Sequence, residues 1–130
     1  MTLILKLPWT APPLSMNDRG ASAGAVFAKN REIKNIRETA RILAISARLP
    51  RECGHASVEL HYRPKDARRR DTDNLTATAK PIYDGLIDFG LVQDDTPEFM
   101  AKLEPVIHQK GVPSMWLEIE IHDEARELPA

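Results

Sequence analysis

Hydrophobic residues recur every three or four positions along two stretches of the chain, the spacing that gathers them on one side of an α-helix. The first stretch extends from Ala28 to Leu49 and stops at a proline. The second extends from Asp73 to about Gly90. Pro81 lies inside it, cannot donate a helical hydrogen bond and crowds the carbonyl four residues earlier. The pattern predicts either a kink there or a short turn followed by a new helix that starts near Lys80.

Four other stretches have the composition or the alternation of β-strands: Thr2 to Leu7, His55 to Arg63, Glu98 to His108 and Ser114 to His122. In the second of them, small or hydrophobic residues alternate with polar ones, as in a strand with one buried face. The segment from Trp9 to Gly24 is rich in Pro, Gly, Ser and Asn and predicts a long loop. This order of elements predicts an α+β fold, a small mixed β-sheet with helices packed on it.

Length and composition favour one folded domain. The chain has 130 residues, of which 42% are hydrophobic, enough for a single core. We expect the domain to extend over residues 1–123 and the tail over residues 124–130 to be frayed. No hydrophobic run approaches the roughly 20 residues of a membrane helix, and no secretion signal is recognisable. We therefore expect a soluble, cytoplasmic protein. The single cysteine, Cys53, allows no internal disulfide and no zinc cluster with histidine.

The net charge of −1 hides a strong asymmetry along the chain. Residues 1–70 carry 14 Lys and Arg against 6 Asp and Glu, a net of +8. Residues 71–130 carry 4 against 13, a net of −9. The asymmetry suggests a surface that faces phosphate and a separate acidic centre. The alternative is that the charges intermix when the chain folds.

The change from basic to acidic residues coincides with the densest group of candidate site residues. Three arginines, Arg68 to Arg70, precede Asp71, Asp73 and Asn74, and the pair Asp94 and Asp95 follows later. Carboxylates bind Mg²⁺, usually together with waters and substrate phosphate, and arginines suit a phosphate backbone. The pattern predicts a metal-dependent enzyme that cuts a phosphodiester in nucleic acid. The alternative is that the two aspartates only cap the following helix.

Other metal and catalytic motifs do not fit the chain. A calcium-binding EF-hand loop that began at Asp71 would need Gly at its sixth position and Glu at its twelfth, where the chain has Thr76 and Ile82. No Gly-rich phosphate loop is present. No nucleophile motif accompanies the histidines, which we interpret as surface or hydrogen-bonded core residues: His55, His61, His108 and His122.

Four motifs, in this order, resemble the RusA family of Holliday-junction resolvases. These are small endonucleases that cut four-way DNA junctions in recombination and repair and are often carried by phages. The motifs are the Pro-rich segment Leu7 to Asn17, then Arg-Asp-Thr-Asp-Asn at Arg70 to Asn74, then Lys80 to Leu86, and Gly-Leu-Val-Gln-Asp-Asp at Gly90 to Asp95. The resemblance extends over residues 3 to about 122.

The resemblance implies a RusA-like homodimer that hydrolyses DNA with Mg²⁺, or Mn²⁺. It implies that Asp71, Asp73 and Asp95 bind the metal and that Lys80 is the catalytic lysine. Family members usually have this lysine four residues after the second aspartate of the motif, where this chain has Ala77. Three further residues are nearly one helical turn, so the lysine stays on the same side of the helix about 5 Å further along. The alternative is that it only pairs with the acidic residue four positions later.

Basic side chains near these motifs are the candidates for contact with the DNA backbone: Arg19, Arg63, Arg68, Arg69 and Arg70. Asn74 and Asp94 are expected to orient the metal ligands without binding the metal themselves. A four-way junction has two symmetry-related cleavage points, which favours a two-fold dimer. Two other functions stay open: a module of the same fold that binds junctions or single strands without cutting, and a metal-dependent enzyme for small phosphorylated substrates.

Overall fold

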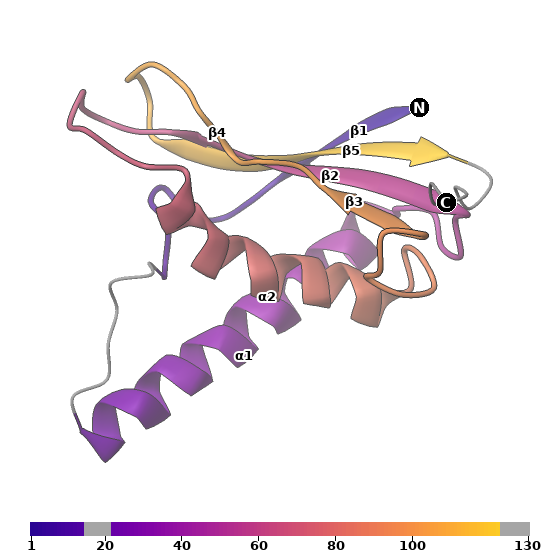
Figure 1. Ribbon diagram of the computed structural model, residues 1–130, viewed down its shortest axis with the longest axis horizontal. Helices are drawn as coiled ribbons and strands as arrows, with labels where there is room; N and C mark the ends of the chain where they lie inside the picture. Colours follow the sequence, from indigo (N-terminus) through magenta and orange to yellow (C-terminus); the bar gives the residue numbers. More distant parts are fainter. Residues whose placement is uncertain (15–21, 123–130) are drawn as a thin grey trace.

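The computed structural model describes residues 1–14 and 22–122 (Figure 1). In chain order the elements are β1 (Thr2–Lys6), α1 (Ala23–Ser46), β2 (His55–Arg63), α2 (Asp73–Phe89), β3 (Met100–Lys102), β4 (Val106–Ile107) and β5 (Ser114–His122). The predictions for Arg19 and for the tail over residues 124–130 lie outside the described residues. No helix in the described part of the chain is long and apolar enough to cross a membrane.

The strands form one mixed sheet in the order β1-β5-β2-β3, and β4 also pairs with β2. β5 is antiparallel to both β1 and β2, whereas β3 and β4 run parallel to β2. The pairing of β2 with β5 is the longest and runs from His55 opposite His122 to Arg63 opposite Ser114. The structure confirms the predicted α+β class with a small mixed sheet, and both of these strands have their predicted bounds.

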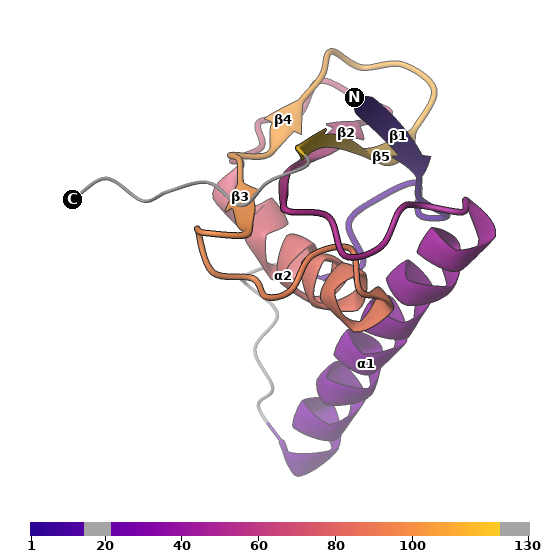
Figure 2. The same cartoon turned by 90° about the vertical axis from the view of Figure 1, so that its right-hand side faces the viewer.

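The two faces of the sheet are chemically different. Both helices lie against one face (Figures 1 and 2). The sheet side chains in the core are hydrophobic, with Leu5, Leu60 and Leu117 side by side across three strands. No helix of the described residues covers the opposite face, which we call the open face. It carries polar and aromatic side chains, including His61 and Trp116, which are paired across β2 and β5.

The two helices cross at close range because one of them has a glycine at the crossing. A Cβ atom added to Gly85 of α2 would lie 2.2 Å from the carbonyl oxygen of Arg37 and 2.8 Å from the Cβ of Ala40, both in α1. Arg37 also forms a bidentate ion pair with Asp88, at 2.5 and 2.7 Å. This ion pair links α2 to α1 at the surface beside the crossing.

α2 continues through Pro81 from Asp73 to Phe89, so the expectation of a turn and a second helix near Lys80 is wrong. Proline removes the hydrogen bond that the carbonyl of Ala77 would otherwise accept. Pro81 is buried, and burial of its apolar ring favours this position in the helix. The helix ends where predicted, at Gly90, whose φ of 96° favours glycine.

The predicted bounds of α1 are wrong at both ends. The helix starts at Ala23 rather than Ala28, because the hydroxyl of Ser22 accepts a hydrogen bond from the N–H of Ala25 and caps it. It ends at Ser46, and Arg48 then adopts a left-handed conformation with a φ of 55°. The first two residues of the helix, Ala23 and Gly24, lie in the segment for which the sequence predicts a loop.

The strand predicted from Glu98 to His108 is also wrong, because the structure divides it into β3 and β4. The two short strands pair with successive parts of β2 and are separated by Leu103 to Pro105. Proline cannot donate a hydrogen bond to a neighbouring strand, which favours the break. The interruption turns Leu103 and Glu104 toward α2, where they line a cleft.

Candidate active-site cleft

A cleft of about 400 Å³ lies between α2 and the segment around the end of β3. Asp73, Lys80 and Tyr83 line it from α2, and Lys102 and Glu104 line it from the other side. Lys80 follows Asp73 by seven positions, which is about two helical turns, so both side chains lie on the same side of α2. The structure thus brings two of the predicted site residues into one cleft.

Asp95 is linked to this cleft through a lysine. The ammonium group of Lys102 donates a hydrogen bond to Asp95 Oδ2 at 3.2 Å. This hydrogen bond and the charge of Lys102 lower the pKa of the Asp95 carboxyl, and the charge of Lys80 lowers it further. Asp95 is therefore within electrostatic reach of both lysines and is ionised at neutral pH.

Lys80 also makes the surface pair considered as the alternative to catalysis. Its Nζ atom lies 3.1 and 3.2 Å from the two carboxylate oxygens of Asp84. The side chain of Lys80 is 62% exposed. Exposed ion pairs contribute little free energy, so this lysine can exchange Asp84 for another anion in the cleft at small cost.

Asp71 and Asp73 lie on either side of the N-cap residue of α2. The N-cap residue is Thr72, whose hydroxyl donates to Glu104 Oε1 at 2.8 Å instead of capping the helix. The N–H of Asn74 donates to the backbone carbonyl of Asp71 at 3.2 Å. Within the described residues, neither aspartate side chain accepts a hydrogen bond from the first turn, so helix capping does not occupy these carboxylates.

The three predicted metal ligands do not form a closed ligand set. Within residues 1–14 and 22–122, Asp71, Asp73 and Asp95 do not make up a group whose oxygen atoms all lie within 4.8 Å of one another. Lys102 holds Asp95, and the other two aspartates are exposed. Binding of one cation by all three would require Asp95 to exchange Lys102 for the ion.

Asp94 shapes the turn that presents Asp95. Its Oδ1 atom accepts a hydrogen bond from the backbone N–H of Asp95 at 2.7 Å. A side-chain hydrogen bond with Asp94 also lowers the pKa of the Asp95 carboxyl. Asp94 thus orients the backbone of Asp95 with its carboxylate. Asn74 contacts Asp71 through its backbone N–H rather than through its side chain.

The predicted DNA-contact arginines differ in how they are held. Arg70 donates to the Asp66 carboxylate at 2.7 Å, and Arg68 donates to the same group at 3.1 Å. These hydrogen bonds, that of Arg70 first, lower the pKa of Asp66 to about 2, so the link persists at neutral pH. Arg69 is exposed and has no hydrogen bond or ion pair with the described residues. Arg63 lies apart from them, on the open face.

The Pro-rich motif of the N-terminal segment is hydrogen-bonded to α2. The buried hydroxyl of Thr78 donates to the carbonyl of Leu14 at 2.7 Å and accepts from its N–H at 3.1 Å. This places Leu14 of the motif beside the helix that carries Asp73 and Lys80. Its remaining residues, from Ser15 to Asn17, lie outside the described residues.

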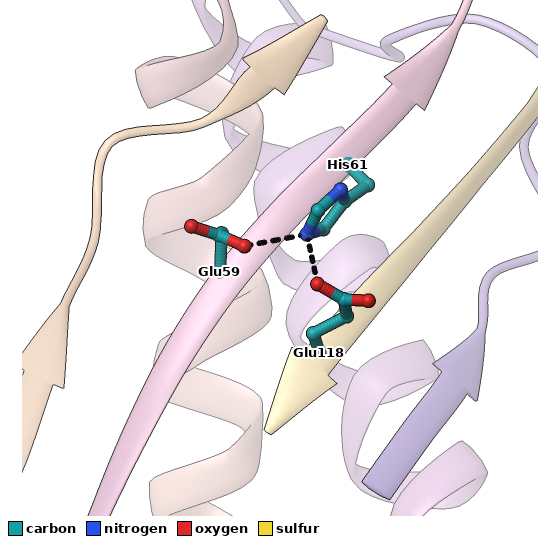
Figure 3. A group of neighbouring side chains, drawn as sticks. All are labelled: Glu59, His61 and Glu118. Carbon is teal, nitrogen blue, oxygen red and sulfur yellow. Dashed lines mark hydrogen bonds and ion pairs between the residues drawn. The ribbon is translucent and has the colours of Figure 1, made fainter. Parts of the chain in front are cut away.

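Several side chains of interest were not predicted. No motif or spacing in the sequence predicts that Lys102 lines the cleft, because only the parallel pairing of β3 with β2 brings it there. On the open face, His61 lies between Glu59 and Glu118 (Figure 3). The alternation of β2 places Glu59 and His61 on one face, a signal visible in the sequence, but Glu118 joins them only through the register of β5.

Comparison of the chain with models of known protein families and with curated proteins finds no match in either set.

Proposed function

We propose that the protein is a Mg²⁺-dependent endodeoxyribonuclease that cuts four-way DNA junctions, the activity that the resemblance to the RusA family implies. One observation carries the proposal: Asp73 and Lys80 line the same cleft as Lys102, the lysine that holds Asp95. A phosphodiester gains negative charge while water attacks it, and fixed cations beside it stabilise that charge. Carboxylates and ammonium groups in one cleft are the chemistry that such a reaction needs.

The donor set fits a hard cation. Asp71, Asp73 and Asp95 offer carboxylate oxygens, the ligands that Mg²⁺ and Mn²⁺ prefer, and none of the three is a buried charge that must stay paired. When bound, such an ion would polarise the scissile phosphate and lower the pKa of a water molecule. The fit requires Asp95 to turn from Lys102 toward the ion.

This exchange gives the two lysines a defined role. Once Asp95 turns away, the ammonium group of Lys102 is free to donate to a phosphate oxygen. Lys80 leaves its exposed contact with Asp84 in the same way and faces the phosphate from α2. Water then adds to phosphorus, the bond from phosphorus to one sugar oxygen breaks, and the two ammonium groups stabilise the charge on the oxygens until the leaving oxygen takes a proton.

DNA binding in the proposal depends on the basic loop before α2. Arg69 is exposed and available to a phosphate, whereas Asp66 orients Arg68 and Arg70. Such contacts position a duplex without reading its sequence. A homodimer would present two clefts to the two symmetry-related cleavage points of a junction, and paired nicks would follow.

Incubation of the purified full-length chain with a synthetic four-way junction tests this function. We expect symmetric paired nicks in Mg²⁺, no nicks in EDTA, and slower cutting of a linear duplex of the same sequence. Product mapping on a denaturing gel provides the measurement.

The same assay separates the two other functions. Tight binding of the junction without nicks in Mg²⁺ or Mn²⁺ would support the non-cutting module, which the contacts of Asp95 with Lys102 and of Lys80 with Asp84 favour. Hydrolysis of a small phosphoester with no action on DNA would support the third function. Either result would contradict the proposed nuclease.

A further inference from the structure

Three potential metal ligands meet on the open face of the sheet, outside the cleft described above. Glu59 and His61 are two residues apart in β2, and Glu118 of β5 is paired directly opposite Glu59. All three side chains therefore leave the same face of two neighbouring, firmly paired strands (Figure 3). The sheet backbone fixes the positions of all three.

The ligand atoms converge on one side of the imidazole ring. His61 Nε2 lies 2.7 Å from Glu59 Oε1 and 2.6 Å from Glu118 Oε2. One ligand atom from each of the three residues can be chosen so that all lie within 4.8 Å of one another. The side chain of His61 is 7% exposed, whereas those of Glu59 and Glu118 are 26% and 38% exposed. The ring is buried, and the carboxylates reach solvent.

The ring of His61 is locked in place by its neighbours. It stacks on Trp116 with 5.2 Å between ring centroids and 13° between ring planes. Its other nitrogen, Nδ1, lies 2.8 Å from Nε2 of His108. When His61 Nδ1 donates its N–H to His108 Nε2, the lone pair of His61 Nε2 is directed at the two carboxylates.

This arrangement needs a positive charge between the three groups. Two carboxylates directly opposite each other on neighbouring strands repel. Nε2 can carry only one proton, which Glu59 and Glu118 could share only in a three-centre hydrogen bond. A metal cation bonded to all three atoms satisfies both carboxylates and the ring nitrogen. Contact of the second ring nitrogen with another polar group is also typical of histidines that bind metals.

We infer that Glu59, His61 and Glu118 form a binding site for a divalent transition-metal ion, with Zn²⁺ as the best fit. Imidazole nitrogen favours Zn²⁺ over Mg²⁺, and two carboxylates with one histidine leave a fourth position for water. Ligands bound at about 2.1 Å in a tetrahedron are about 3.4 Å apart. The exposed carboxylates therefore need to move away from the ring by less than one ångström.

This site differs from the cleft in its chemistry and is independent of the proposed function. The ion would link β2 to β5 on the open face, whereas the cleft offers only oxygen ligands for Mg²⁺. Zn²⁺ binding at the open face would stand even if the protein did not cut DNA. Failure of Zn²⁺ binding would leave the proposed nuclease untouched.

Isothermal titration of the full-length, tag-free chain with Zn²⁺ tests the site. The variants are Glu118→Gln and Glu59→Gln, which keep the side-chain shape and lie at part-exposed positions, so that the fold is retained. Glu120→Gln is the matched control, because it is on the same strand and face but contacts the N-terminal amino group. All four proteins should also carry Asp73→Asn, which weakens ion binding in the cleft.

We expect one Zn²⁺ per chain in the parent and in the Glu120→Gln control. Each of the other two variants should bind at least about 100-fold more weakly. As an independent readout, Co²⁺ bound to the parent should give visible absorption bands that Glu118→Gln changes or removes. Absence of stoichiometric binding would overturn the inference, as would equal affinity in the parent and both ligand variants.

Discussion

Replacement of Asp73 by Asn is expected to reduce junction cleavage at least about 1,000-fold while the protein stays folded and still binds the junction. The change keeps the shape of the side chain but removes its charge and its value as a metal ligand. Asp73 is exposed in the first turn of α2, so the loss of favourable interaction with the helix dipole costs only about 0.3–1 kcal/mol. Single-turnover nicking rates in Mg²⁺ and gel-shift affinities provide the measurement.

Glu38→Gln is a suitable control for this variant. It removes one negative charge from the exposed surface of α1, where Glu38 pairs with Arg41, and should leave the nicking rate unchanged. A rate for Asp73→Asn within tenfold of the unmodified protein would contradict the assignment of Asp73 to the metal. A loss of binding as large as the loss of cutting would instead assign Asp73 to DNA contact.

Replacement of Gly85 by Ala is expected to have the largest effect on stability, a loss of about 3 kcal/mol or more in the free energy of unfolding. The new Cβ would lie 2.2 Å from the carbonyl oxygen of Arg37, a backbone atom that cannot rotate away. The helices would have to separate and would lose the packing of Ala40 and the ion pair of Arg37 with Asp88. The better helix propensity of alanine, worth about 1 kcal/mol, is too small to compensate.

Gly24→Ala provides the same substitution without the clash. Its added Cβ would meet nothing closer than the hydroxyl oxygen of Ser22, at 3.9 Å. Urea denaturation should therefore give a free energy of unfolding equal to or slightly above that of the unmodified protein. If Gly85→Ala unfolded at the same urea concentration as Gly24→Ala, the close crossing of α1 and α2 would be wrong.

Local signals in the sequence predict much of the fold. The alternation in β2 and β5 fixes their bounds, and the three- and four-residue spacing finds both helices. The failures arise where tertiary packing overrides a local rule. Pro81 stays inside α2 because its ring is buried, and β3 separates from β4 because each pairs with a different part of β2.

The candidate site is less accessible to sequence analysis than the fold. The spacing of Asp73 and Lys80 on one helix predicts their shared cleft, because helical geometry is local. The contact of Asp95 with Lys102 depends on two loops and an edge strand that no local pattern positions. The same limit applies to His61 and its two glutamates, which meet only through the register of β2 with β5.

Location of bound Mn²⁺ by anomalous diffraction tests the central claim most directly. In crystals soaked with Mn²⁺, we predict an anomalous peak in the cleft, within bonding distance of carboxylate oxygens from Asp73 and Asp95, with Lys102 displaced from Asp95. A map with no peak among Asp71, Asp73 and Asp95, or with a peak only at the site of Glu59, His61 and Glu118, would contradict the proposal of a metal-dependent nuclease in this cleft.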